Sequence, residues 1–157
     1  MNIKSFIKKL FILLITVSLT ACSNTIKEES YHEVSTIEKA VADAGFPMEI
    51  PEELASSVLK EINVYDSGMI EVIYLDLNHH ETGRIRKAKC NYSDISNNFE
   101  EYARIEDNER NGIVYTMKCI KSIVYLVLWN DDGYTYSLYV TKGKYLVDMY
   151  DVLDMIK

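Results

Sequence analysis

Two short runs of histidine and carboxylate residues could bind a metal ion. The first is His79-His80-Glu81, and the second is Asp131-Asp132-Gly133. Adjacent histidines on a strand point to opposite faces, so only a loop could bring both side chains to one ion. A calcium site needs about six to eight oxygen ligands, and the second run lacks the spaced acids of a calcium-binding loop. We therefore interpret both runs as exposed turns and predict no metal ion and no other cofactor.

The sequence also lacks the motifs that usually identify an enzyme. Serine, histidine and aspartate all occur, but there is no Gly-x-Ser-x-Gly nucleophile elbow, no phosphate-binding loop and no dinucleotide fingerprint. Paired carboxylates stay open as a catalytic device, because the chain has 24 acidic residues and nothing singles out one pair. We predict no catalytic residue and hence a protein that is not an enzyme.

The chain has three cysteines: Cys22, Cys90 and Cys119. Cys90 and Cys119 each end a segment that is predicted to be a strand. If Cys22 is modified they form an even pair, and a disulfide between them would persist outside the cytoplasm. Two buried thiols are the alternative. No Cys-x-x-Cys or His-x-x-x-His spacing accompanies either cysteine, which argues against a zinc site.

The first 21 residues have the layout of a secretory signal peptide. Lys4, Lys8 and Lys9 give a positively charged start without any acid, and an apolar run follows over Leu10–Val17. This run is shorter than the roughly 20 residues that a helix needs to cross a bilayer. We therefore expect residues 1–21 to be a cleaved leader rather than a permanent membrane helix.

Leu19-Thr20-Ala21-Cys22 resembles the lipobox of bacterial lipoproteins, in which a small residue precedes an invariant cysteine. The resemblance implies that diacylglycerol is transferred to the Cys22 thiol, that the chain is cut after Ala21, and that the new amino terminus is usually acylated. An ordinary signal peptide that ends in cysteine is the alternative. Two or three lipid chains hold a protein on a membrane, whereas one chain binds only marginally. The implied location is the extracytoplasmic side of the cell membrane.

Removing residues 1–21 from the 157-residue chain would leave 136 residues, which is enough for one domain with a hydrophobic core and too few for two. Those residues would include 14 basic and 24 acidic side chains, for a net charge of −10. Such a chain is poorly suited to bind nucleic acid or an anionic membrane through its own surface. We expect residues 22–31 to form a lipid-anchored tether and residues 32–157 to form a single extracytoplasmic domain.

Hydrophobic periodicity predicts a first and a last helix in this domain, and Pro51 followed by two acids predicts a short helix between them. Ser35 and Glu38 fit a capping box at the start of the first helix, and Gly45 suits its end. Residues 91–111 are polar and are expected to form a surface region with one helical turn near 99–103. The predicted helices cover 35–45, 51–60 and 145–156.

Alternating β-branched and aromatic residues predict a set of strands. Asn130-Asp131-Asp132-Gly133 predicts a hairpin loop, with Trp129 opposite Tyr134. The order of elements predicts an α+β fold, with an antiparallel β-sheet and the N-terminal and C-terminal helices packed on one of its faces. The predicted strands cover 69–77, 84–90, 113–119, 123–129 and 134–140.

The arrangement of these elements resembles uncharacterised lipoprotein domains of Gram-positive bacteria, which are grouped as a domain of unknown function. The resemblance rests on a helix closing on Gly45-Phe46, on Pro51, on a strand ending in Trp129, and on the segment Tyr134-Thr135-Tyr136-Ser137-Leu138 before a terminal helix. It covers most of residues 33–157. It implies a small extracytoplasmic α+β domain with no established activity.

Tyrosine is abundant, with 12 Tyr against 4 Phe and 1 Trp. Tyrosine suits binding interfaces because it buries area and keeps a hydroxyl for water, although it also suits half-exposed strands in general. Our leading hypothesis is a membrane-anchored, non-catalytic binding or accessory module with a cell-envelope protein as partner. The alternative is a carrier or chaperone for lipid or lipoprotein, which requires an open apolar concavity. A hydrolase is the third hypothesis.

Overall fold

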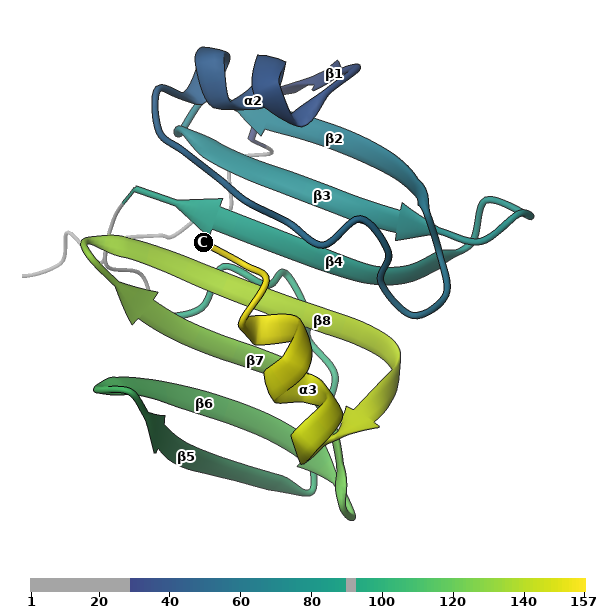
Figure 1. Cartoon of the computed structure of the whole chain (residues 1–157), viewed down its shortest axis with the longest axis vertical. Coiled ribbons are helices and arrows are strands. Elements are labelled where there is room, and N and C mark those ends of the chain that lie inside the picture. Colours follow the sequence, from purple (N-terminus) through teal and green to yellow (C-terminus); the bar gives the residue numbers. More distant parts are fainter. Residues whose placement is uncertain (1–28, 90–92) are drawn as a thin grey trace, which may run out of the picture.

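The computed structural model describes residues 29–89 and 93–157, which form one eight-stranded antiparallel sheet and two short helices (Figure 1). Across the sheet the strands follow the order β1-β2-β3-β4-β8-β7-β6-β5. Two meanders of four strands are therefore joined where β4 pairs with β8. The strands are β1 (Tyr31–Val34), β2 (Leu59–Tyr65), β3 (Met69–Leu75), β4 (Glu81–Ala88), β5 (Arg104–Arg110), β6 (Ile113–Ile120), β7 (Ile123–Asp131) and β8 (Tyr134–Tyr145). The helices are α2 (Ile37–Ala44) and α3 (Leu146–Leu153).

The predicted α+β class is wrong, because the domain is mostly one large sheet with little helix. Residues 51–60, predicted to be a helix, run irregularly and enter β2 at Leu59. The strand β5 occupies a segment that was predicted to be a polar loop. As an edge strand it is largely solvated, so its sequence shows no apolar alternation. The four-residue strand β1 is too short to show a periodicity, and it begins at Tyr31, within the predicted tether.

The predicted first and last helices are present, and both lie over the same side of the sheet (Figure 1). We call this side the helix face. Thr36, rather than Ser35, caps α2, because its hydroxyl accepts a hydrogen bond from the amide of Lys39 at 3.3 Å. Gly45 ends the helix with a φ of 77°, a conformation that favours glycine.

The main hydrophobic core lies between the helix face and the segments that cover it. Ala40 of α2 and Met149 of α3 are fully buried against strand residues such as Ile85 and Leu138. The connecting segment 45–58 covers the area between the helices (Figure 1). Complete burial of a leucine side chain contributes about 1.5–3 kcal/mol, so these contacts account for much of the stability of the sheet.

The β7–β8 hairpin has a tighter turn than the sequence predicts. Its two-residue loop is Asp132-Gly133, with φ values of 46° and 78°. Positive φ at both positions is typical of the type I′ turn, whose twist matches that of the strands. Trp129 consequently lies opposite Tyr136 instead of Tyr134. This shift of two residues leaves every side chain on its predicted face, because the side-chain period of a strand is two.

A row of aromatic rings crosses the helix face next to this turn. The rings of Trp129 and Tyr136 stack with centroids 4.8 Å apart and planes 5° apart, and the ring of Tyr115 lies 5.7 Å from that of Trp129. Register places Tyr115 opposite Trp129 and Trp129 opposite Tyr136. Cross-strand aromatic pairs of this kind each contribute about 0.5–1.5 kcal/mol beyond the area that they bury.

Lys87 lies at one end of this row and is only 2% exposed. Its ammonium group is 4.5 Å from the ring centroid of Tyr134 and 5.0 Å from that of Tyr136. The group donates a hydrogen bond to the carbonyl oxygen of Pro47 at 2.6 Å. Burial lowers the pKa of Lys87, although the negative charges of Asp131, Asp132 and Glu49 oppose this shift.

We expect the stability of the wild-type protein to rise relative to a Lys87→Met variant as the pH increases from 7 to 9.5. The lowered pKa means that folding opposes the charged amine. This cost is fully present below the folded pKa and is relieved as the pH rises towards the unfolded value of about 10.4. Urea unfolding of both proteins at the two pH values measures the difference. A difference that does not change with pH would contradict the lowered pKa.

Candidate functional site

The opposite side of the sheet, which we call the far face, is partly covered by residues 93–103. This crossing segment leads from the end of β4 towards β5. Its Ile95 packs against Met69 and Ala88, which form a small second hydrophobic cluster. Near its other end, the ring of Tyr102 lies 6.4 Å from that of Tyr125. The segment therefore has its own anchoring contacts on the sheet.

A buried ionic cluster lies on the far face, beneath and beside the crossing segment. Glu71 of β3 is 3% exposed and Arg86 of β4 is 6% exposed. The Nε of Arg86 donates to a carboxylate oxygen of Glu71 at 2.6 Å, and the Asn63 amide donates to the other oxygen at 3.1 Å. These three residues lie directly opposite one another on adjacent strands. Cross-strand register thus assembles the cluster.

The environment of Glu71 keeps its carboxyl group ionised. Burial alone would raise its pKa, but the charge of Arg86, the hydrogen bond from Asn63 and the charge of Arg84 together lower it. The Tyr65 hydroxyl donates to the same carboxylate at 3.0 Å. Burial and the nearby charge of Glu71 raise the pKa of Tyr65 to about 12, so this hydroxyl stays protonated as a donor. The cluster is a fixed ion pair at neutral pH.

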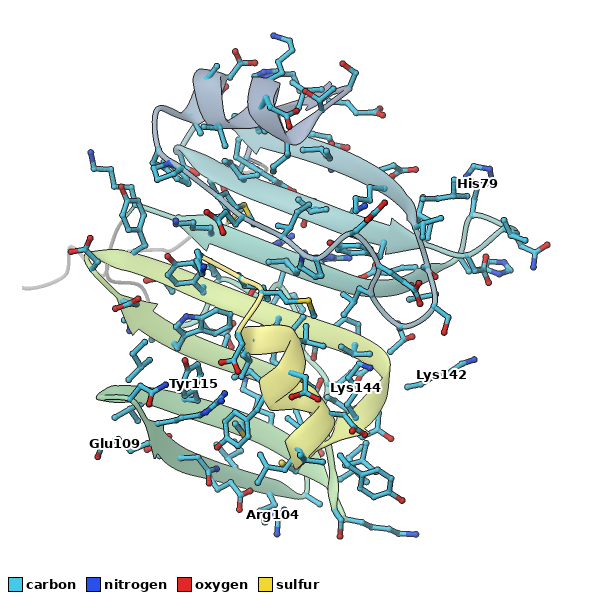
Figure 2. The ribbon with its side chains drawn as sticks, in the orientation of Figure 1. His79, Arg104, Glu109, Tyr115, Lys142 and Lys144 are labelled. Carbon is cyan, nitrogen blue, oxygen red and sulfur yellow. The ribbon has the colours of Figure 1, made fainter. Side chains whose placement is uncertain are left out.

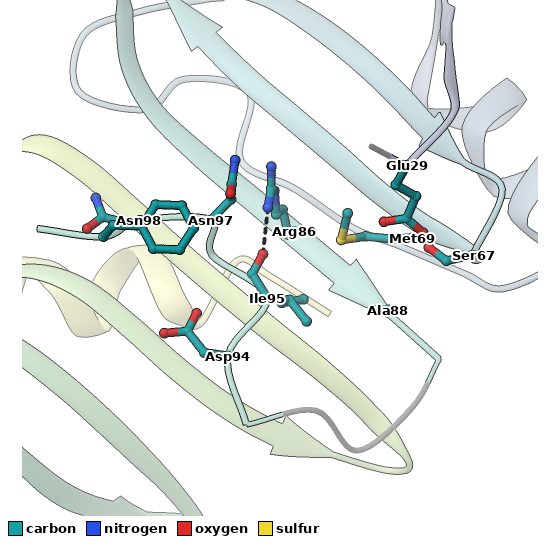
Figure 3. A pocket seen from close by; sticks show the side chains of 10 residues that line it. Glu29, Ser67, Met69, Arg86, Ala88, Asp94, Ile95, Asn97 and Asn98 are labelled. Carbon is teal, nitrogen blue, oxygen red and sulfur yellow. Dashed lines mark hydrogen bonds between the residues drawn. The ribbon is translucent and has the colours of Figure 1, made fainter. Parts of the chain in front are cut away.

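A pocket of about 400 Å³ opens between this cluster and the crossing segment (Figure 3). Met69, Ala88 and Ile95 supply its apolar lining. Arg86 also lines the pocket and donates from Nη1 to the carbonyl oxygen of Ile95 at 2.7 Å, so the guanidinium ties the crossing segment to the sheet (Figure 3). The polar lining further includes the side chains of Asp94, Asn97 and Asn98.

The crossing segment is held in place by Asp94. Its carboxylate accepts a hydrogen bond from the Lys118 ammonium at 2.8 Å and another from the Ser96 hydroxyl at 2.6 Å. Burial opposes ionisation of Asp94, but these hydrogen bonds outweigh it and lower the pKa. Phe99 lies at the pocket and is 81% exposed. An exposed aromatic ring beside a pocket offers a surface on which a ligand can pack.

The carboxyl groups of Glu71, beside the pocket, and of Asp94, in its lining, both stay ionised. A general acid or base works best with a pKa near the working pH, whereas the carboxyl groups of Glu71 and Asp94 have lowered pKa values and stay ionised. The positive charge of Arg86 is compensated by Glu71, so Arg86 offers little net charge to attract an anionic ligand. The side-chain amide of Asn97 can both donate and accept hydrogen bonds. The amide oxygen of Asn98 already accepts from the Glu100 amide and the Tyr102 hydroxyl, so Asn98 can offer its NH2 group as a donor.

The residues predicted to be exposed turns do not contribute to this pocket. His79 lies on the loop that projects from the sheet beyond β3 (Figure 2). The Nδ1 of His80 is 3.5 Å from the Asp76 carboxylate, and both side chains are substantially exposed. Within residues 29–89 and 93–157, no group of three histidine, cysteine or acidic side chains is placed to hold a metal ion.

The predicted cysteine sites lie elsewhere or outside the described ranges. Cys22 and Cys90 both fall outside the residues that the structure describes. Cys119 is fully buried on the helix face of β6. The strands β8 and β7 separate β6 from β4, which ends two residues before Cys90. The disulfide between Cys90 and Cys119 stays a prediction, as does lipidation of Cys22.

Sequence reasoning missed the pocket, although one signal was present. Glu71 interrupts the otherwise apolar strand β3, and Arg84 and Arg86 alternate with apolar Ile85 in the more polar strand β4. Charges that alternate with apolar residues in neighbouring strands indicate a buried ion pair, because an isolated charge is costly to bury. The crossing segment gave no such signal, since most of its residues are polar and it has no regular secondary structure.

In the part of the chain that the structure describes, neither helix has the length and apolar character needed to cross a bilayer. Comparison with protein-family models, with curated proteins and with solved structures gave no match to this chain.

Proposed function

We propose that the protein is a lipid-anchored extracytoplasmic binding module whose far-face pocket holds an uncharged segment of a cell-envelope protein. The observation that carries the binding role is the pocket itself, with its apolar lining beside an internally neutralised ion pair. The address rests on the lipobox resemblance at Cys22 and on the leader that precedes it.

The pocket suits a peptide segment for two reasons. Its apolar residues Met69, Ala88 and Ile95 match a small or medium apolar side chain. The side-chain amide of Asn97 can pair with an N–H and a C=O group of a peptide backbone, and the NH2 group of Asn98 can donate to a further C=O group. These backbone groups would otherwise lose hydrogen bonds on leaving water. A charged ligand would gain less, because Arg86 is already paired with a carboxylate.

The carrier hypothesis finds no support on the helix face. It requires the sheet itself to curve around an apolar cavity, whereas Met149, Val152 and Leu153 of α3 are buried against that face. We therefore keep the binding module as the proposed function.

Photo-crosslinking in intact cells tests the proposal. A benzophenone side chain in place of Phe99, introduced into the full-length protein, should give a crosslinked adduct in the membrane fraction. Ser67 is exposed and lines the pocket, so Ser67→Trp should block the mouth and abolish the adduct. Asp66→Trp is the matched control, because Asp66 is also exposed but does not line the pocket. An adduct that both tryptophan variants retain, or no adduct at all, would refute binding in this pocket.

A further inference from the structure

A second concave surface lies on the other side of the molecule, between α2 and the residues that follow α3. Its volume is about 550 Å³, and most of its lining is apolar. We call it the α2–tail groove. Its apolar lining consists of Ile37 and Val41 from α2, Pro47, Met48 and Ile50 from the connecting segment, and Met155 after α3.

The walls of the α2–tail groove are held in place by backbone hydrogen bonds. The amide of Glu49 donates to the carbonyl oxygen of Lys157 at 2.8 Å, and the amide of Lys157 donates to the carbonyl oxygen of Glu49 at 3.2 Å. This reciprocal pair fastens the residues after α3 to the connecting segment. Met48 is 5% exposed and belongs to the main hydrophobic core. A groove with fixed walls loses little conformational entropy when it binds.

The groove is apolar and yet accessible. Met155 is 45% exposed, and Ile37, Val41 and Ile50 are each half-buried. A partner that covered these side chains would remove apolar surface from water at about 25 cal/mol per Å².

Two carboxylates, Glu38 and Glu49, border the groove. The carboxylate of Glu38 accepts hydrogen bonds from its own backbone amide and from the Thr36 side chain, which lowers its pKa and keeps it ionised. The Glu49 carboxylate lies 3.6 Å from the Lys157 ammonium, but both side chains are about 70% exposed. Exposed pairs of this kind are weak, so Glu49 still presents negative charge to a partner.

We infer that the α2–tail groove is a docking site for a protein segment that carries Lys or Arg beside apolar residues. The apolar lining would hold the apolar side chains, and Glu38 and Glu49 would face the cations. A second copy of this acidic chain would bring like charge to the same rim. An anionic lipid surface would be repelled for the same reason. The site is independent of the far-face pocket, so the domain could hold two protein segments at once.

Fluorescence anisotropy with a short probe tests this docking site. The probe is a labelled pentapeptide, Lys-Leu-Leu-Lys-Leu, with both ends blocked. The protein is the full-length lipidated form in nanodiscs of zwitterionic phosphatidylcholine, and empty nanodiscs supply the blank. We expect saturable binding that weakens as salt is added. The same peptide with Glu in place of Lys should bind at least tenfold more weakly.

Matched charge reversals separate the groove from the overall charge of the protein. Glu38→Lys combined with Glu49→Lys should weaken probe binding about tenfold, which corresponds to about 1.4 kcal/mol. Glu61→Lys combined with Glu109→Lys changes the net charge equally at exposed positions away from the groove, and it should change affinity less than twofold. Glu109 lies on the edge strand β5 (Figure 2). Equal losses in the two double variants would overturn the inference.

A neutral variant tests the apolar part of the site without altering α2. Met155→Gln keeps the length of the side chain and removes apolar surface from an exposed position, so the fold should tolerate it. We expect about threefold weaker binding of the probe. Unchanged affinity for Met155→Gln, or no saturable binding by the wild-type protein, would also overturn the docking site.

Discussion

Replacing Arg86 with Met should destabilise the folded protein by about 3–5 kcal/mol at pH 7, because the substitution leaves the Glu71 carboxylate buried without its main counter-charge. Glu71 is 3% exposed, and Arg86 provides its shortest hydrogen bond, at 2.6 Å. The variant also loses the bond from Arg86 to the carbonyl oxygen of Ile95, so the crossing segment should loosen. Urea unfolding followed by tryptophan fluorescence measures the stability.

The pH dependence identifies the cause of this loss. In the wild-type protein the folded pKa of Glu71 lies below its unfolded value of about 4.3, so its stabilisation is complete above that pH and is lost as the pH falls through the folded pKa. In Arg86→Met the Asn63 amide and Arg84 still oppose the effect of burial, but Arg86 no longer does, so the folded pKa of Glu71 should rise above the unfolded value. The difference in unfolding free energy between the wild-type protein and Arg86→Met should therefore shrink as the pH is lowered from 7 to 4. A difference that stays constant would indicate lost packing instead.

The double variant Arg86→Met with Glu71→Gln provides the control. It removes both charges and leaves an amide that can still accept from Asn63 and Tyr65. Replacing a whole buried ion pair is usually far less costly than removing one partner. The double variant should therefore be more stable at pH 7 than Arg86→Met alone. If the losses of stability in the single variants Arg86→Met and Glu71→Gln add up to the loss in the double variant, the pair does not act as a unit.

The Cys22→Ala variant should incorporate no fatty acid at all. The lipobox resemblance assigns the lipid to the Cys22 thiol, and alanine offers no nucleophile for diacylglycerol transfer. Cells grown with an alkyne analogue of palmitate, followed by click labelling of the immunoprecipitated protein, give the readout. The variant should also keep its leader, so its mass should match the uncut precursor.

A second cysteine variant makes this result specific. Cys119→Ala also removes one thiol, but Cys119 is buried in the core and is not expected to carry lipid. It should incorporate the analogue at the wild-type level. Wild-type protein whose mature amino terminus proves to be unmodified would disprove the lipid anchor.

Sequence patterns located most of the strands in which one face or both faces are buried, although β2, whose residues 62–64 are buried, was not predicted. The strands β3, β6, β7 and β8 all begin at the predicted residue, because each combines apolar alternation with a clear turn before it. The strand β5 was missed because both its faces are partly solvated and its residues are mostly charged. Residues 51–60 were predicted to be helical from Pro51 and the acids after it. In the folded chain this segment instead buries Leu54 against the sheet next to Gly83.

The pocket could not be predicted for a related reason. It depends on which residues lie opposite each other across β2, β3 and β4, and this register was not predicted. It also depends on where the crossing segment settles, which is decided by single contacts such as that of Asp94 with Lys118. Contacts between residues 24 positions apart leave no periodic trace in the sequence.

The point at which the chain enters the sheet sets how far the pocket can stand from a bilayer. Tyr31 pairs with Tyr65, so β1 begins at the end of the strands where the turn with Ser67 lies and where β4 ends. Residues at this end of the strands also line the pocket. The nine residues from Cys22 to Ser30 reach at most about 30 Å when fully stretched. An anchor at Cys22 would thus confine the pocket to a thin shell above the lipid headgroups, where only membrane-proximal stretches of another protein could enter it.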